Sequence, residues 1–244
     1  MRNIKLTLEY DGTHFFGFQT QKKFRTVQSE LEQALRKLFG KKIKVVASGR
    51  TDSGVHAEGQ VVNFSVESDL ALFKIERGLN RYLAEDLAVK AAEEVPLSFH
   101  SQYSAKWKAY EYRILHSKNR SPLERSRAFY IPYPLNVRKM KKAADLIRGK
   151  HDFRVFEGSG SRRKTSVRHI RVLNVRNTGN QIRVRLEANG FLYKMVRSIV
   201  GTLVEIGSGR LKVEEVRKMI SECDKKLVGA TVPPQGLVLK EVKY

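Results

Sequence analysis

Residues 49–66, GRTDSGVHAEGQVVNFSV, hold a short loop that leads into a segment of alternating character. The closing five residues, VNFSV, alternate apolar and polar side chains, which predicts a half-buried strand. The six residues before the loop, 43–48, alternate in the same way and predict another strand. Arg50, Asp52 and His56 are therefore expected in a tight loop between two strands, where a rigid scaffold can aim them.

The local pattern allows two interpretations of Asp52. Asp followed by Ser-Gly is ordinary turn chemistry, because the carboxylate accepts backbone N–H bonds and the glycine takes a positive φ. The other interpretation is a carboxylate placed for catalysis. Spacing alone leaves both of them open.

The segment GRTDSGVHAEGQV resembles, almost without gaps, the catalytic loop of the TruA family of tRNA pseudouridine synthases. The resemblance implies that Asp52 is the catalytic nucleophile and that Arg50 occupies or steadies the space of the flipped nucleotide. It implies an isomerase that converts uridines at positions 38, 39 and 40 of the tRNA anticodon stem-loop to pseudouridine. This reaction needs no redox change and no outside energy source, so no cofactor is expected.

Three more stretches carry the resemblance in the family's order: YDG with FGFQTQ near the N-terminus, then KAYEY, then FLYKMVRSIVGTLVEIG. KAYEY contains Tyr110, which the resemblance implies stacks against the target base. The third stretch contains Arg197, which the resemblance implies pairs with Asp52. The residues that depart from the family pattern here are Gln102, in the junction FHSQYSA that precedes KAYEY, and Tyr193 and Lys194 in the third stretch.

Arg197 also stands out from the residues around it. Residues 191–206 are apolar almost all round, which predicts a buried helix. An arginine within such a helix requires an anionic partner, because a buried unpaired charge is costly.

The order of predicted elements before residue 105 is β-α-β-β-α-β, the ferredoxin-like arrangement. Residues 106–244 have the look of a second variant of the same arrangement. We therefore expect an α+β protein of two halves, 1–105 carrying the Asp52 loop and 106–244 carrying Tyr110 and Arg197. The resemblance implies that the two ferredoxin-like halves form one continuous, mainly antiparallel sheet with a central cleft, the pseudouridine synthase fold.

Charge is distributed very unevenly over a chain with a net charge of +22. Residues 1–105 carry 15 Lys and Arg against 13 Asp and Glu, whereas residues 106–244 carry 32 against 12. Such an excess predicts a polyanionic partner held mainly by the second half, and the resemblance implies tRNA. Residues 157–171, EGSGSRRKTSVRHIR, are rich in Gly, Ser and basic residues and are expected to form a loop that binds RNA phosphates. The alternative is a solvated loop without a partner, which the same composition allows. The residues predicted to bind RNA are Arg162, Arg163, Lys164 and Arg168.

Three phenylalanines within four residues, Phe15, Phe16 and Phe18, follow the first predicted strand. They suit either a hydrophobic core or a surface on which bases stack. The sequence leaves this choice open.

Other features limit the class of protein. The chain has no CxxC, Walker or HExxH motif, and its single cysteine, Cys223, cannot form an internal disulfide. No stretch reaches about 18 apolar residues and the N-terminus enters a strand directly, so we expect neither a membrane span nor a signal peptide. The single cysteine favours a cytoplasmic protein. The absence of the metal-binding motifs indicates that no metal is required. The resemblance implies a homodimer. The rival hypotheses are a non-catalytic RNA-binding protein and a metal-dependent nuclease using Asp52 and Asp152.

Overall fold

The computed structural model describes residues 1–160 and 165–244. The chain is of the mixed α+β class and divides into two compact units. The first unit comprises Met1–Lys106 and Val238–Tyr244, and the second comprises Trp107–Leu237. The C-terminal strand is thus grouped with the first unit.

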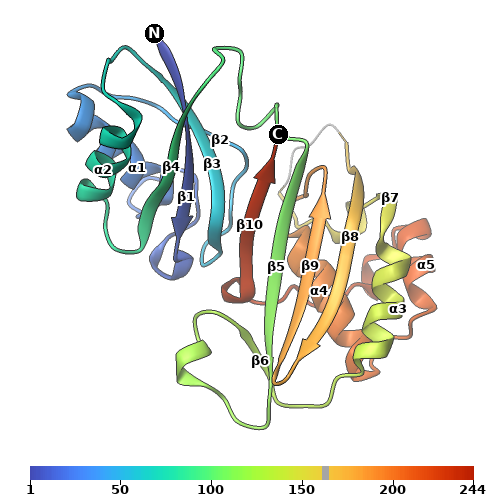
Figure 1. Cartoon of the computed structure of the whole chain (residues 1–244). Helices are drawn as coiled ribbons and strands as arrows, with labels where there is room; N and C mark the ends of the chain where they lie inside the picture. Colours follow the sequence, from blue (N-terminus) through green and yellow to red (C-terminus); the bar gives the residue numbers. More distant parts are fainter. Residues whose placement is uncertain (161–164) are drawn as a thin grey trace. The chain divides into compact units, whose positions relative to one another are not determined.

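The first unit has the β-α-β-β-α-β order predicted for it (Figure 1). Its elements are β1 (Arg2–Tyr10), α1 (Val27–Phe39), β2 (Val46–Ala47), β3 (His56–Val66), α2 (Leu72–Tyr82), β4 (Leu87–Val95) and the C-terminal β10 (Leu237–Lys243). In its sheet β1 lies between β4 and β3 and is antiparallel to both. The other edge of β3 is shared: β2 pairs with it near Val62, and β10 pairs in parallel near His56.

The core of the first unit lies between this sheet and its two helices. Ile4, Leu6 and Leu8 of β1 are completely buried, as are Leu31 of α1 and Leu79 of α2. Burial of each such side chain contributes about 1.5–3 kcal/mol. Helix α1 is capped at both ends: Thr26 accepts the Ser29 N–H, and Gly40 ends the helix with φ +70°.

The strand expected before the Asp52 loop is shorter than predicted. Ile43 and Val45 are buried, as their alternation indicates, but only Val46 and Ala47 pair in the sheet. The Val45 N–H instead donates to the Glu32 carboxylate at 3.2 Å. A side-chain acceptor thus takes the place of a ladder hydrogen bond.

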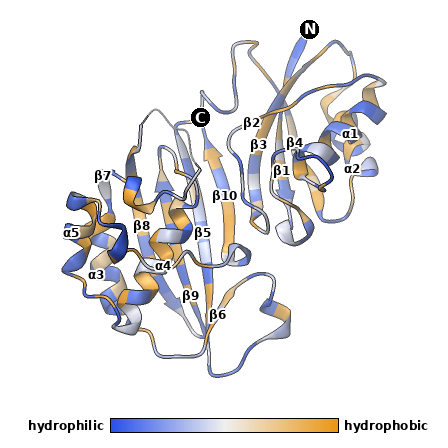
Figure 2. Cartoon of the chain, turned by 180° about the vertical axis from the view of Figure 1, so that it is seen from behind, coloured by the Kyte–Doolittle hydropathy of each residue, from blue (hydrophilic) through white to orange (hydrophobic). Residues whose placement is uncertain are grey.

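The second unit is an antiparallel sheet with helices α3 and α4 packed against it (Figures 1 and 2). Its elements are β5 (Trp107–His116), β6 (Phe129–Ile131), α3 (Val137–Ile147), β7 (Gly149–Asp152), β8 (Val167–Thr178), β9 (Gln181–Ala188), α4 (Met195–Ser208) and α5 (Glu215–Glu222). The strand order is β5-β9-β8-β7, and β6 adds to β5 in parallel. When the short strands β6 and β7 are left out, the order β5-α3-β8-β9-α4 matches the order β1-α1-β2-β3-α2 of the first unit.

Strand register sorts the side chains of this sheet onto two faces. Tyr110, Tyr112 and Ile114 of β5 lie opposite the buried Leu186, Val184 and Ile182 of β9. The alternate residues form the opposite face, which carries polar and charged side chains. The buried face is the one that α3 and α4 cover.

Helix α4 begins four residues later than the apolar run predicts. Lys194 precedes its first residue, Met195, with a left-handed backbone of φ +58°. Because that conformation is incompatible with a continuing α-helix, residues 191–194 form an irregular entry to α4.

Candidate active site

The Asp52 loop, residues 48–55, closes as a turn between β2 and β3. The Val55 N–H donates to the Asp52 carbonyl at 3.2 Å, and Gly54 has φ +77°. The side chain of Asp52 remains half-buried and Arg50 is exposed. The backbone of the loop thus has the turn geometry of the first interpretation, while the catalytic interpretation of the carboxylate stays a prediction.

A neighbouring segment, residues 15–18, holds the Asp52 loop by its backbone. The Phe18 N–H donates to the Thr51 carbonyl at 3.1 Å, and the Gly54 N–H donates to the Phe15 carbonyl at 3.3 Å. Gly17 has φ +86°, and a Cβ there would lie 2.9 Å from the Thr51 carbonyl oxygen. Only glycine allows this approach without displacing the loop.

A buried polar network fixes the other side of the Asp52 loop. The hydroxyls of Tyr10 and Thr51 are 2.8 Å apart, and the Gln60 amide donates to the Gly49 carbonyl at 3.0 Å. The Ser48 hydroxyl donates to Gln60 Oε1 at 2.7 Å. Burial raises the pKa of Tyr10 to about 12. Backbone on both sides of Arg50 is thereby fixed.

His56 follows the loop as the first residue of β3 and is 7% exposed. Its Nδ1 accepts the Gly12 N–H at 3.0 Å. The Asp11 carboxylate lies 3.1 Å from the same nitrogen. His56 thus ties the start of β3 to the YDG turn.

In the second unit, Tyr110 lies on the helix-covered face of β5 and is 9% exposed. Its ring meets that of Phe191 edge to face, with centroids 5.1 Å apart. Two residues on, the Tyr112 hydroxyl donates to the Pro233 carbonyl at 2.7 Å, and burial raises its pKa well above the ordinary value. Tyr110 therefore has a rigid aromatic setting.

Arg197 lies in the first turn of α4 and is half-buried. Its Nε donates to the Val232 carbonyl at 2.8 Å, which ties α4 to the segment before β10. This contact fixes the direction of the guanidinium. The expected pairing of Arg197 with Asp52 joins residues of different units and stays a prediction.

The predicted RNA-binding residues Arg162, Arg163 and Lys164 lie outside the described residues. Arg168 lies in β8, where one of its guanidinium nitrogens donates to the carbonyls of Thr165 at 3.0 Å and Val167 at 2.6 Å. Both of these hydrogen bonds join Arg168 to residues that are close to it in the sequence.

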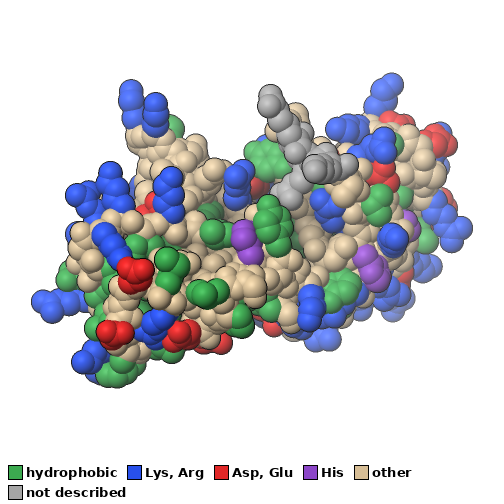
Figure 3. Space-filling view, turned by 90° about the horizontal axis from the view of Figure 1, so that it is seen from above, with side chains coloured by type: hydrophobic (Ala, Val, Ile, Leu, Met, Phe, Trp, Pro, Cys, Tyr) green, Lys and Arg blue, Asp and Glu red, His purple; other side chains and the backbone are tan. Residues whose placement is uncertain are grey.

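Further arginines gather on the sheet face of the second unit that α3 and α4 leave uncovered. They are Arg113 of β5, Arg176 of β8, and Arg183 and Arg185 of β9. Arg113 contacts Glu111 at 3.0 Å, while the other three side chains are exposed. Lys and Arg also dominate the charged side chains in the view of Figure 3. The charge excess of the second half is thus partly organised on a sheet face.

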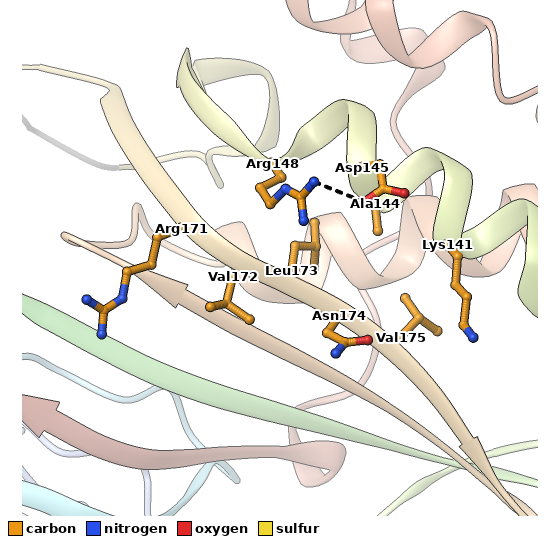
Figure 4. Close-up of a pocket in the computed structure, with 9 residues that line it drawn as sticks. All are labelled: Lys141, Ala144, Asp145, Arg148, Arg171, Val172, Leu173, Asn174 and Val175. Carbon is orange, nitrogen blue, oxygen red and sulfur yellow. Dashed lines mark ion pairs between the residues drawn. The ribbon is translucent and has the colours of Figure 1, made fainter.

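A hollow of about 350 Å³ lies between α3 and β8 (Figure 4). Lys141, Arg148 and Arg171 line it, and Arg148 contacts Asp145 at 3.4 Å. None of the predicted site residues lines it. The hollow is therefore a basic surface feature of the second unit.

The rival nuclease hypothesis depends on Asp152. Arg154 Nε donates to that carboxylate at 2.7 Å, and this hydrogen bond lowers the pKa of Asp152 to about 2. Within residues 1–160 and 165–244, no three His, Cys, Asp or Glu side chains are grouped as metal ligands. None of the helices in the same ranges is long and apolar enough to cross a membrane.

Comparison with known proteins gives the family. The sequence profile of a family described as tRNA pseudouridine synthase matches residues 7–104 and 143–244. Three curated relatives named tRNA pseudouridine synthase A align over 244 residues, the whole of both chains. They come from Thermoanaerobacter sp. (strain X514) at 43% identity, Acetivibrio thermocellus at 42% and Clostridium botulinum (strain Eklund 17B / Type B) at 44%.

Among solved structures, the match to one chain in a crystal structure of a Cbf5-Nop10-Gar1 complex covers 82% of this chain and 54% of that chain. The sequence identity is 12% and the TM-score 0.36, a likeness too low to support an argument. The family profile and the full-length relatives suffice without it. The chain belongs to the TruA family of tRNA pseudouridine synthases, the isomerase family that its Asp52 loop resembles.

Proposed function

We propose that this chain converts uridines at positions 38, 39 and 40 of the tRNA anticodon stem-loop to pseudouridine. The observation that carries the proposal is the Asp52 loop: a family sequence, held by buried contacts on both sides, with the Asp52 carboxylate half-buried. A preorganised nucleophile of this kind suits a reaction in which one group must attack and then leave.

The reaction breaks the N1–C1′ bond of uridine, turns the uracil and forms a C5–C1′ bond. The proton at C5 leaves and N1 gains one, so atoms balance without a redox partner. In this proposal Asp52 attacks either C6 of the uracil or C1′ of the ribose. Either attack needs an ionised carboxylate, which an adjacent guanidinium stabilises.

The other predicted residues act on the same nucleotide. The base must leave its stack to be reached, and Arg50 steadies the space that it vacates. Tyr110, held edge to face by Phe191, covers the extruded base. Arg197, whose guanidinium is directed by the Val232 carbonyl, pairs with Asp52 in this proposal.

Binding of tRNA is assigned mainly to the second half. Its net excess of basic residues and the exposed arginines of β8 and β9 suit a phosphate backbone. Arg162, Arg163, Lys164 and Arg168 are proposed as further phosphate contacts. A homodimer acting in the cytoplasm completes the proposal, which needs no metal and no cofactor.

The alternative is a non-catalytic RNA-binding protein, which the basic surface alone equally supports. The test uses an unmodified tRNA transcript that has uridines at positions 38–40 and elsewhere. Carbodiimide modification followed by primer extension maps pseudouridine after incubation with the protein. Stops are expected only at the nucleotide 3′ of each of positions 38–40, whereas tight binding without any stop favours the alternative.

A further inference from the structure

Two exposed aromatic rings lie together beside the Asp52 loop. Phe16 is 48% exposed and Phe24 is 47% exposed, with ring centroids 4.4 Å apart and an interplanar angle of 33°. Phe15 and Phe18, by contrast, are each 2% exposed. Of the three phenylalanines that follow β1, Phe15 and Phe18 belong to the hydrophobic core. Phe16 lies at the surface, next to Phe24.

These rings belong to a short projection that we call the aromatic finger, residues 16–25. Its residues 19–24 are all exposed, and a bridge between Gln21 and Phe24 closes its tip. Lys22 and Lys23 form the tip, and Lys23 has a left-handed backbone with φ +70°. A non-glycine residue in that conformation is strained, and such strain is found at functional sites more often than elsewhere.

The aromatic finger is firmly anchored. The Phe16 N–H donates to the Arg25 carbonyl at 2.9 Å, which joins its two ends. The Arg25 guanidinium makes two hydrogen bonds to Asp86, at 2.6 and 2.8 Å, and lies 4.2 Å from the centroid of the Phe15 ring. The Gln21 side chain donates to the Phe16 carbonyl at 2.7 Å.

The anchoring also fixes the finger relative to Asp52. Phe16 lies between Phe15, whose carbonyl accepts the Gly54 N–H, and Phe18, whose N–H donates to the Thr51 carbonyl. All of these residues belong to the first unit. The exposed rings are therefore held at one position relative to Asp52.

We propose that Phe16 and Phe24 form a platform on which a base flanking the target uridine stacks. Lys22 and Lys23 contact the phosphates of the same strand. Aromatic rings interleaved with lysines are the chemistry that binds single-stranded RNA. Extrusion of the target base leaves its neighbour without a stacking partner, and the platform replaces that partner. This inference rests on the proposed function and names a contact of its substrate.

The test measures stacking and turnover separately. An anticodon stem-loop RNA carries 2-aminopurine next to a target uridine, because the fluorescence of this base falls when it stacks. Phe16→Ala and Phe24→Ala are compared with wild type and with Phe73→Ala, which removes a 59% exposed phenylalanine from α2. Thermal melting checks that each variant folds, and Phe16→Tyr, which keeps a ring, serves as the rescue.

Quenching by wild type, Phe73→Ala and Phe16→Tyr is expected, with loss of quenching in Phe16→Ala and Phe24→Ala. The two alanine variants should also raise Kd and KM about tenfold to hundredfold with little change in kcat, because the stack forms before the reaction. Equal quenching in all proteins overturns the platform. So does dissociation of a dimer by Phe16→Ala, since the rings would then form a protein interface. Absence of pseudouridine with wild type contradicts the proposed function, while the quenching result still decides on the platform.

Discussion

The hydroxyls of Tyr10 and Thr51 lie 2.8 Å apart in a part of the first unit where Tyr10 is 3% and Thr51 7% exposed. Thr51 is the residue before Asp52, so this bond connects the end of β1 to the proposed nucleophile. Gln60 adds a second connection through the Gly49 carbonyl. The position of the proposed nucleophile thus depends on a buried hydrogen-bond network behind the loop.

Tyr10→Phe removes the bond to Thr51 and leaves a buried hydroxyl without its partner. We expect a loss of about 1–3 kcal/mol in the free energy of unfolding, the usual cost of such a change. We also expect a several-fold lower kcat with nearly unchanged KM, because the carboxylate is less well placed while RNA contacts remain. Tyr82→Phe, at a 41% exposed position on α2, is the control. Unchanged kcat in Tyr10→Phe would show that Thr51 does not position Asp52.

The same tyrosine predicts an alkaline instability. The pKa of Tyr10 is about 12 in the folded protein against 10.0 for an ordinary tyrosine. Between these values the unfolded chain releases this proton and the folded protein keeps it, so stability falls as pH rises. One such group contributes a slope of up to about 1.4 kcal/mol per pH unit. Urea unfolding from pH 9 to 12 should show a shallower slope for Tyr10→Phe than for wild type, and parallel slopes would contradict the assignment.

Gly17→Ala tests the close approach between the aromatic finger and the Asp52 loop. Its Cβ would lie 2.9 Å from the Thr51 carbonyl oxygen, and φ +86° strains any side chain there. Gly40→Ala is the matched control, because Gly40 has φ +70° but nothing within 4 Å of the new Cβ. Both variants should lose about 1 kcal/mol of stability to backbone strain, but only Gly17→Ala should also lose kcat. Equal activity in the two variants would mean that the loop tolerates displacement.

Arg197 is expected to have two roles. Its charge pairs with Asp52, and its Nε–H holds the segment before β10 through the Val232 carbonyl. Arg197→Lys keeps the charge and loses the planar guanidinium, whereas Arg197→Ala loses both. We expect at least a hundredfold lower kcat for alanine and partial activity for lysine. Single-turnover rates on saturating tRNA measure this difference. Similar rates for alanine and wild type would exclude the proposed pairing with Asp52.

Much of the fold can be predicted from the periodicity of apolar residues in the sequence. Where that prediction differs from the structure, the cause is local. Helix α3, Val137–Ile147, can be derived from the sequence because its buried residues Met140, Ala144 and Ile147 recur at helical spacing. Strands β6 and β7 were missed, since three or four residues are too few to show alternation. The late start of α4 depends on the left-handed Lys194, which no pattern indicates.

Only some residues of the candidate site can be identified from the sequence. Asp52, Arg50, Tyr110 and Arg197 were found through motif resemblance, whereas Tyr10 and Gln60 were missed. Their function depends on long-range hydrogen bonds that spacing does not encode. Tyr10 did have one signal, because it opens the YDG turn that contacts His56. Phe24 had none, because only the folded finger brings it against Phe16.

The central claim, that Asp52 of this chain performs the isomerisation, is tested most directly by tritium release. An unmodified tRNA transcript labelled with tritium at uridine C5 is incubated in EDTA with wild type or Asp52→Asn, and tritium in water is counted. Binding of both proteins to the transcript is measured in parallel. The account predicts release by wild type alone, with similar Kd for the two proteins. Release by Asp52→Asn at the wild-type rate, or binding without release by either protein, would contradict it.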